Sequence, residues 1–199
     1  MERRESNSYF LTGRPGVGKS TLFNRMIDEL RRQGCSVGGI AAPEVRVEGR
    51  RIGFRIVDIA SGAEGWLARS GVFGPYRVGR YTVIVDDVIN VGVKALEYAI
   101  ERSDVIGIDE IGPMELMVRE LREAIIRVLS STKPVIGVVH RGLRSRDPPL
   151  YKLVVVKGPI VEVTIENRGE LASEVVRVAR YIASRTGCSK GGQGPNSPV

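Results

Sequence analysis

The stretch Gly13-Arg14-Pro15-Gly16-Val17-Gly18-Lys19-Ser20 decides the fold, because it matches the pattern GxxxxGK[ST] in full. The apolar run 8–11 precedes it, and Leu22, Met26 and Leu30 follow it at helical spacing. A strand, a glycine-rich turn and a helix in this order are the context that such a phosphate-binding loop requires. The sequence therefore predicts an α/β domain whose first turn holds phosphate groups.

Each residue type in this loop suits a nucleoside triphosphate. Glycines let successive backbone N–H groups turn toward phosphate oxygens, and the following helix adds the positive end of its dipole. We expect Lys19 to reach the β- and γ-phosphates and Ser20 to offer a hydroxyl ligand to Mg²⁺. The predicted nucleotide-binding residues are Gly13, Arg14, Pro15, Gly16, Val17, Gly18, Lys19, Ser20 and Thr21.

Two adjacent carboxylates end the apolar run 105–108. Asp109 can hold Mg²⁺ directly or through water, so the predicted metal ligands are Ser20 and Asp109. Glu110 is expected on the other side of the strand's end, where it can orient or deprotonate a water for attack on the γ-phosphorus. This arrangement favours hydrolysis with Glu110 as a catalytic residue. A small kinase, or a solvated strand-end charge at Glu110, stays open.

Phosphoryl transfer also needs a further cation for the charge of the transition state. The segment 74–81, rich in small residues, offers Arg77 and Arg80, which we predict as catalytic residues beside Lys19; both could equally be surface arginines. His140 ends the apolar run 135–139 and could sense the γ-phosphate, although a structural histidine is the favoured interpretation.

Length and composition predict one domain over residues 1–186 and a polar, Gly/Pro-rich, disordered tail over 187–199. No apolar stretch approaches the roughly 20 residues that cross a bilayer, and the charged start is unlike a signal peptide. A cytoplasmic protein without membrane contact is expected. Cys35 and Cys188 lie far apart in the sequence, so reduced structural thiols are predicted rather than a zinc site or a disulfide.

The net charge of +7 is compatible with a nucleic-acid partner, but the arginines are scattered along the chain. A nucleotide-switched nucleic-acid-binding module is therefore an alternative, not the favoured function. The sequence contains no Asn-Lys-x-Asp segment, which would recognise a guanine base, so broad nucleotide acceptance is expected. Trp66 or a neighbouring aromatic could stack on the base, but ordinary packing is favoured. The sequence does not indicate an oligomeric state.

Between the motifs, the patterns predict the remaining elements less sharply. Val45 and Val47 alternate with polar residues before residues 52–56 do the same, which indicates an antiparallel hairpin. Residues 61–81 have no clean period and predict a long loop. The apolar runs 153–156 and 160–165 predict a second hairpin, and Asn167 is expected to cap the last helix with Glu170 completing the box.

Taken together, four segments resemble the thermophile and cancer-related nucleoside-triphosphatases. They are residues 13–21, 44–54, 78–81 and 109–116, and the most specific is the last, Asp-Glu-Ile-Gly-Pro-Met-Glu-Leu. The resemblance covers roughly residues 9–171. It implies a P-loop fold of the RecA-like branch, with a mixed, mostly parallel central sheet flanked by helices. It also implies slow, Mg²⁺-dependent hydrolysis of ATP, GTP and other triphosphates.

Position by position, the resemblance implies that Lys19 binds phosphate and that Ser20 binds the metal. It also implies that Asp109 and Glu110 form the family's second motif. Arg80 lies in the family's Gly-basic-Tyr segment. Pro113 departs from the pattern, because many relatives carry lysine there, so any role of that cation is lost or moved. Residues 82–87 also match the pattern only loosely, which weakens the assignment of the two arginines.

Overall fold

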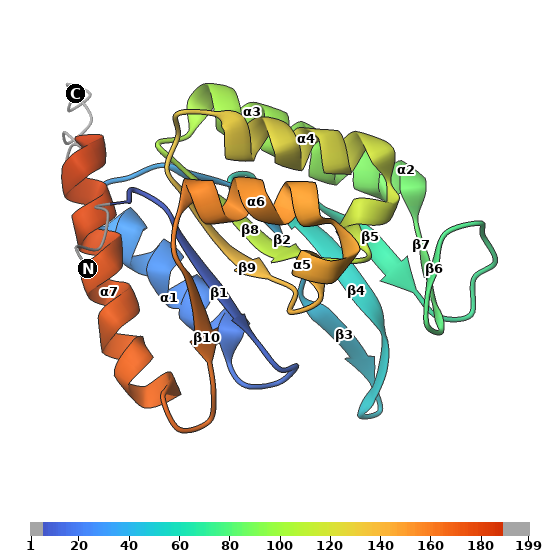
Figure 1. The fold of residues 1–199 in the computed structure, drawn as a ribbon. Helices are drawn as coiled ribbons and strands as arrows, with labels where there is room; N and C mark the ends of the chain where they lie inside the picture. The colour runs from blue at the N-terminus through green and yellow to red at the C-terminus, as the bar shows by residue number, and fades with distance from the viewer. Residues whose placement is uncertain (1–5, 189–199) are drawn as a thin grey trace, which may run out of the picture.

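A ten-stranded mixed sheet forms the centre of the molecule in the computed structural model, which describes residues 6–188 (Figure 1). The strands are β1 (Tyr9–Gly13), β2 (Val37–Ala41), β3 (Glu44–Val47), β4 (Arg50–Asp58), β5 (Glu64–Arg69), β6 (Arg77–Val78), β7 (Tyr81–Val83), β8 (Val105–Ile111), β9 (Val135–Val139) and β10 (Ile160–Val163). The helices are α1 (Lys19–Arg32), α2 (Val85–Asp87), the π-helix η1 (Val88–Val93), α3 (Lys94–Arg102), the short 3₁₀ turn η2 (Glu115–Met117), α4 (Arg119–Ser130), α5 (Leu143–Arg146), α6 (Pro148–Lys157) and α7 (Arg168–Thr186).

Five neighbouring strands, in the order β10-β1-β9-β8-β2, run parallel to one another. Strands that are covered on both faces carry continuous apolar runs, and all five residues of β9 are buried. β9 separates the strand that leads into the phosphate loop from the strand that carries the two carboxylates. This order confirms the predicted α/β class with a mixed central sheet flanked by helices.

Two helical layers cover the parallel strands (Figure 1). Helices α1 and α7 pack on one face, and α3, α4 and α6 pack on the other. The alternation of β1 splits its side chains between the two cores, with Tyr9 and Leu11 on the α1 side and Phe10 on the opposite side. The apolar stripe of α1 is buried against the sheet, so this helix and the loop at its N-terminus are held firmly.

Strands β3 to β7 form an antiparallel extension of the sheet beyond β2. The predicted hairpin is confirmed, because β3 pairs with β4. The predicted long loop over residues 61–81 is wrong, because β5 pairs with β4 and β7 inside this segment. A register shift beside Phe54 interrupts the alternation, and Leu67 and Ala68 are both buried although they are adjacent. Such an irregularity hides the period of two on which strand prediction rests.

The predicted second hairpin is also wrong, because the apolar run 153–156 lies in helix α6. Asp147 begins this helix by accepting a hydrogen bond from the Leu150 backbone N–H, and Pro148 occupies its first turn. Val154 is buried, whereas Val155 and Val156 are exposed. A short apolar run does not separate a strand from a helix. The second half of the predicted hairpin is the edge strand β10, parallel to β1.

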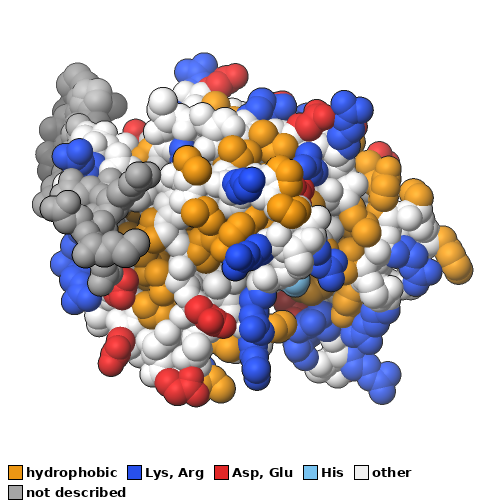
Figure 2. Space-filling model, in the orientation of Figure 1, with side chains coloured by type: hydrophobic (Ala, Val, Ile, Leu, Met, Phe, Trp, Pro, Cys, Tyr) orange, Lys and Arg blue, Asp and Glu red, His pale blue; other side chains and the backbone are white. Residues whose placement is uncertain are grey.

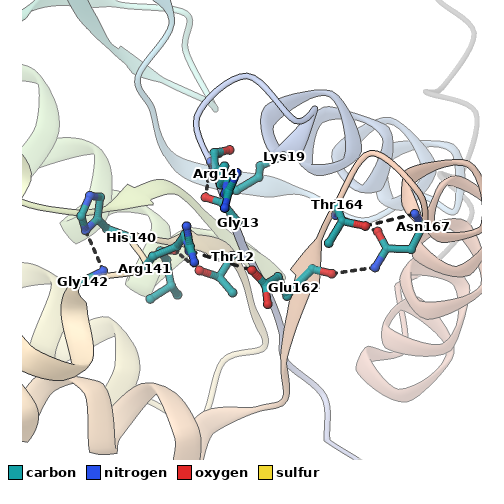
Figure 3. Close-up of polar contacts among 11 residues, drawn as sticks. Thr12, Gly13, Arg14, Lys19, His140, Arg141, Gly142, Glu162, Thr164 and Asn167 are labelled. Atoms are coloured by element: carbon teal, nitrogen blue, oxygen red, sulfur yellow. Dashed lines mark hydrogen bonds and ion pairs between the residues drawn. The ribbon is translucent and has the colours of Figure 1, made fainter.

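Asn167 precedes α7, as predicted, but its side chain does not cap the helix. Its Oδ1 accepts a hydrogen bond from the Thr164 backbone N–H, and its amide donates to the Glu162 carbonyl oxygen (Figure 3). Asn167 therefore closes the turn between β10 and α7, and the expected capping box with Glu170 does not form.

The two cysteines form a disulfide, Cys35–Cys188, so the prediction of reduced thiols is wrong. Cys35 follows α1 and Cys188 follows α7, and the parallel packing of these helices places their C-terminal ends side by side, with Arg180 of α7 paired with Glu29 of α1. Most of the predicted disordered tail, residues 189–199, lies outside the described part of the chain, as do residues 1–5 of the predicted domain. Within residues 6–188, no helix combines the length and apolar character that crossing a bilayer requires.

Candidate active site

The phosphate loop connects β1 to α1 and owes its path to glycine. Gly13 has φ of 147°, and a Cβ at this position would stand 2.4 Å from the Val163 carbonyl oxygen of β10. Gly18, directly before α1, has φ of 108°, a region that side chains with a Cβ rarely adopt. Val17 is buried in the core beneath the loop. The loop is therefore anchored from below while its backbone curves around the space above α1.

Lys19 reaches back across this loop. Its Nζ donates hydrogen bonds to the carbonyl oxygens of Gly13 and Arg14, both at 3.1 Å (Figure 3). Burial raises the pKa of Asp109 and of Glu110 and lowers that of His140, and the Lys19 ammonium acts to lower the pKa of all three groups. One cation thus influences the side chains of Asp109, Glu110 and His140.

Asp109 and Ser20 meet between the two motifs. The Asp109 side chain is buried at the end of β8, and its carboxylate accepts a hydrogen bond from the Ser20 hydroxyl. Burial raises the pKa of Asp109, whereas Ser20 and Lys19 lower it. Within residues 6–188, no group of three or more His, Cys, Asp or Glu side chains could hold a metal by itself. The paired oxygens fit Mg²⁺, which takes few protein ligands beside phosphate oxygens and waters.

Glu110 occupies a shift in the pairing of β8 with β9, which joins Asp109 to Val138 and Ile111 to Val139. As the extra residue of the shift, Glu110 does not take part in the pairing. Burial raises the pKa of Glu110, the Lys19 charge opposes this and the Asp109 charge adds to it, and together they bring the pKa to about 7. A carboxyl group with a pKa near neutrality can accept a proton from water and release it again.

Glu115 is a buried member of the site that sequence reasoning did not single out. Its Oε2 and the Oε1 of Glu110 lie 3.1 and 3.2 Å from the point where a Cβ on Gly112 would stand. Burial raises the pKa of Glu115 to about 8, and the charges of Glu110 and Asp109 raise it as well. Glu115 lies in the segment 109–116, which the sequence marked as important. A turn separates Glu115 from strand β8, however, so the spacing along the chain did not predict where its side chain lies.

This burial predicts a stability that depends on pH. The folded-state pKa of Glu115, about 8, lies above its ordinary value of 4.5, so its contribution is complete below 4.5 and is lost as pH rises through 8. We expect Glu115→Gln to exceed the parent protein in unfolding free energy by about 3–5 kcal/mol at pH 9 and to match it near pH 5. Urea unfolding at both pH values measures this, with the exposed Glu120→Gln as control. Equal pH slopes for Glu115→Gln and the parent would contradict it.

His140 follows β9 and faces the same site. Its Nδ1 accepts a hydrogen bond from the Gly142 backbone N–H at 3.0 Å, so the neutral ring carries its hydrogen on Nε2 (Figure 3). Burial lowers its pKa, and so do the charges of Arg146, Lys19 and Arg141. His140 is the single histidine of the chain. Figure 2 shows it as the pale blue patch in a hollow beside acidic and basic side chains.

A cavity of about 340 Å³ lies next to His140. Gly112 and Pro113 form one wall, and Arg146 contributes a cation. Arg146 and Arg141 were noted in the sequence only as part of a small basic cluster. Their position after a parallel strand that ends at the phosphate loop is the signal that could have identified them.

The structure does not bring Arg77 and Arg80 to this site. Arg77 lies in strand β6 and Arg80 in the turn before β7. Strand β6 is at one edge of the sheet, whereas β1, which leads into the phosphate loop, is next to the opposite edge. Arg80 donates to the Arg51 carbonyl oxygen at 2.7 Å and to the Tyr81 hydroxyl at 3.1 Å. The loop residues, Lys19, Ser20, Asp109 and Glu110 do come together, whereas these two arginines belong to the antiparallel extension.

Known proteins share this sequence and architecture. A family model described as NTPase matches residues 8–176. Nucleoside-triphosphatase THEP1 of Methanopyrus kandleri is 44% identical over 178 residues, which is 88% of this chain and 97% of that protein. Nucleoside-triphosphatase THEP1 of Pyrococcus abyssi is 41% identical over 177 residues, covering 89% and 94% of the two chains.

Solved structures agree with these matches. The crystal structure of THEP1 from Aquifex aeolicus superposes with a TM-score of 0.74 at 27% identity, covering 86% of this chain and 98% of that one. The solution structure of a human cancer-related nucleoside triphosphatase superposes with a TM-score of 0.70 at 32% identity, covering 85% and 95%.

Proposed function

The chain belongs to this nucleoside-triphosphatase family, and from that premise we propose that it cleaves ATP, GTP and other nucleoside triphosphates to the diphosphate and phosphate in a Mg²⁺-dependent reaction. The observation that carries the proposal is the partly buried Glu110 carboxyl beside Asp109, with its pKa near 7. A cytoplasmic location is part of the proposal.

The loop and Lys19 bind the triphosphate. Its β- and γ-phosphates lie along the backbone N–H groups that follow Gly13, and the Lys19 ammonium moves from the carbonyl oxygens it now contacts to phosphate oxygens. Ser20 and Asp109 would hold Mg²⁺. When bound there, the ion would neutralise phosphate charge.

Glu110 acts on the attacking water. The carboxylate accepts one proton from the water as the water oxygen forms a bond to the γ-phosphorus. The bond between the γ-phosphorus and the bridging oxygen breaks, and that oxygen leaves with the nucleoside diphosphate. The proton on Glu110 then passes to solvent or product, which restores the base.

A further cation is still needed for the charge of the transition state. Arg146 and Arg141 are better placed for this than Arg77 and Arg80, because both influence His140 beside the loop. Pro113, at the position where the family resemblance leads us to expect lysine, lines the same cavity as Arg146. We therefore assign the displaced cationic role to Arg146.

A panel of nucleotides tests the proposal. We expect Mg²⁺-dependent phosphate release from ATP, GTP, CTP and UTP without any second substrate, at rates within about tenfold of one another because the loop contacts phosphates and not bases. EDTA should stop the release. Turnover that appears only after a nucleoside or metabolite acceptor is added would instead favour the kinase alternative.

A further inference from the structure

Arginine and aromatic side chains gather on the antiparallel extension. Four guanidinium groups lie over aromatic rings in the described part of the chain, and all four are here. The guanidinium carbons of Arg55 and Arg69 lie 4.2 and 5.0 Å from the centre of the Trp66 ring. The two other pairs are Arg51 over Phe54 at 5.4 Å and Arg80 over Tyr81 at 5.2 Å.

One face of this extension is open. Strands β4 and β5 contact η1, and β5 also contacts α2, on the face that carries Ile56 and Leu67. Helices α1 and α7 lie under the parallel strands instead (Figure 1). On the open face Trp66 pairs with Arg55 across the strands, and its ring extends over Gly53, with Cζ3 3.0 Å from where a Cβ would stand. The missing side chain at Gly53 makes room for the ring.

The extension is also basic. Residues 44–83 contain seven arginines and four acidic residues, a net charge of +3 within a total of +7. Glu44 is paired with Arg46 and Arg51, and Glu64 lies 3.7 Å from Arg55. Arg69 is exposed and has no carboxylate partner among the ion pairs of the described residues. Of the four arginines that lie over rings, Arg51 and Arg55 thus also contact a carboxylate, whereas Arg69 and Arg80 have ring contacts without an ion pair among the described residues.

We propose that this open face binds single-stranded nucleic acid, with Trp66, Arg55 and Arg69 at the centre of the contact. Unpaired bases expose planar faces that stack on indole and guanidinium groups, and the phosphates between them pair with arginine. A duplex hides its bases, and an acidic protein or lipid surface would use the charge but not the rings. Cross-strand pairing with Thr82 places Arg77 in the same row as Arg69 and so on this face, whereas Arg80 lies over Tyr81, which packs in the core on the covered face.

The single tryptophan of the chain provides a direct test. Titration with a 20-nucleotide oligo(dT) or oligo(U) at about 50 mM salt should quench Trp66 fluorescence, because a base stacks beside the ring. Labelled-oligonucleotide polarisation should show that Arg69→Gln and Arg55→Gln each weaken binding and each reduce the slope of log K against log[salt] by about 0.7. Trp66→Leu should weaken binding by about tenfold or more through lost stacking.

The matched control is Arg185→Gln, an exposed arginine near the end of α7, which should leave affinity and salt slope unchanged. Thermal unfolding midpoints show that each variant is folded before it is compared. Absence of quenching and polarisation change at 50 mM salt would overturn the proposal. So would equal binding of duplex DNA or heparin, or an Arg185→Gln effect as large as that of Arg69→Gln.

Discussion

Glu110→Gln should lower the turnover number for ATP by about 10²–10⁴-fold, the range attributed to a positioned general base. Glutamine keeps the size and the partly buried position of the side chain but cannot accept a proton from water. The nucleotide should still bind, because the loop and Lys19 are untouched. Isothermal titration with a non-hydrolysable ATP analogue and a phosphate-release assay measure the two quantities separately.

The pH profile gives this prediction a second, independent readout. The pKa of Glu110 is about 7, and only the deprotonated form is a base. We therefore expect kcat/KM of the parent enzyme, which reports the free enzyme, to rise with pH through about 7 and to level off above it. In Glu110→Gln the residual rate should lose this inflection.

Glu120→Gln is the matched control, because Glu120 is an exposed carboxylate in the first turn of α4, outside the segment 109–116. It should retain the parent turnover and the parent pH profile. Full turnover in Glu110→Gln would show that water is activated by another group, and Glu115 would be the next candidate. Loss of nucleotide binding in Glu110→Gln would show instead that the carboxyl shapes the binding site.

The sequence predicted the centre of the site because that centre is made of local patterns. The residues of the loop from Gly13 to Ser20 are consecutive in the sequence. Between a strand and a helix, this pattern of glycines and lysine is typical of phosphate binding. Asp109 and Glu110 sit at the end of a buried strand, where parallel topology brings them to the same sheet edge as the loop. Both inferences needed only the order of elements along the chain.

The remainder of the site depends on tertiary packing. Glu115 reaches Glu110 across a turn, and Arg146 reaches His140 from a short helix, and neither contact follows a fixed spacing. Arg77 and Arg80 were placed at the site because small residues and arginines suggested a mobile loop. Their strands, β6 and β7, pair at the opposite edge of the sheet, beyond β5, whose register shift against β4 hides the alternation in the sequence.

The disulfide was missed for a related reason. Cys35 and Cys188 are separated by 153 positions, so no spacing rule could pair them. Their proximity follows from the packing of α1 against α7. The apolar stripe of each helix shows that the helix is buried on one side, but it does not show which helix is its neighbour. Disulfides are rare in cytosolic proteins of mesophiles, whereas intracellular proteins of hyperthermophiles carry them often.

Removing this disulfide should be the largest single loss of stability in the molecule. Cross-linking residues so far apart restricts the unfolded chain by an amount that corresponds to about 5 kcal/mol for a loop of this length. We expect Cys188→Ser, or the parent protein in reductant, to lose about 3–5 kcal/mol of unfolding free energy and roughly 10 °C in Tm. Denaturant unfolding with and without reductant measures the loss.

Reductant should have no effect on Cys188→Ser, since the chain has only these two cysteines. Cys188 is the better position to mutate, because Cys35 is buried and a hydroxyl there would add its own cost. The bond lies beyond the C-terminal end of α1, and the phosphate loop lies at the other end, about 20 Å away along the helix. Well below the reduced protein's Tm, turnover should therefore be unchanged. A fall in turnover while the protein is still folded would mean that the bond also holds the loop in place, and the cross-link would then be part of the active site's support rather than a stabiliser of the fold alone.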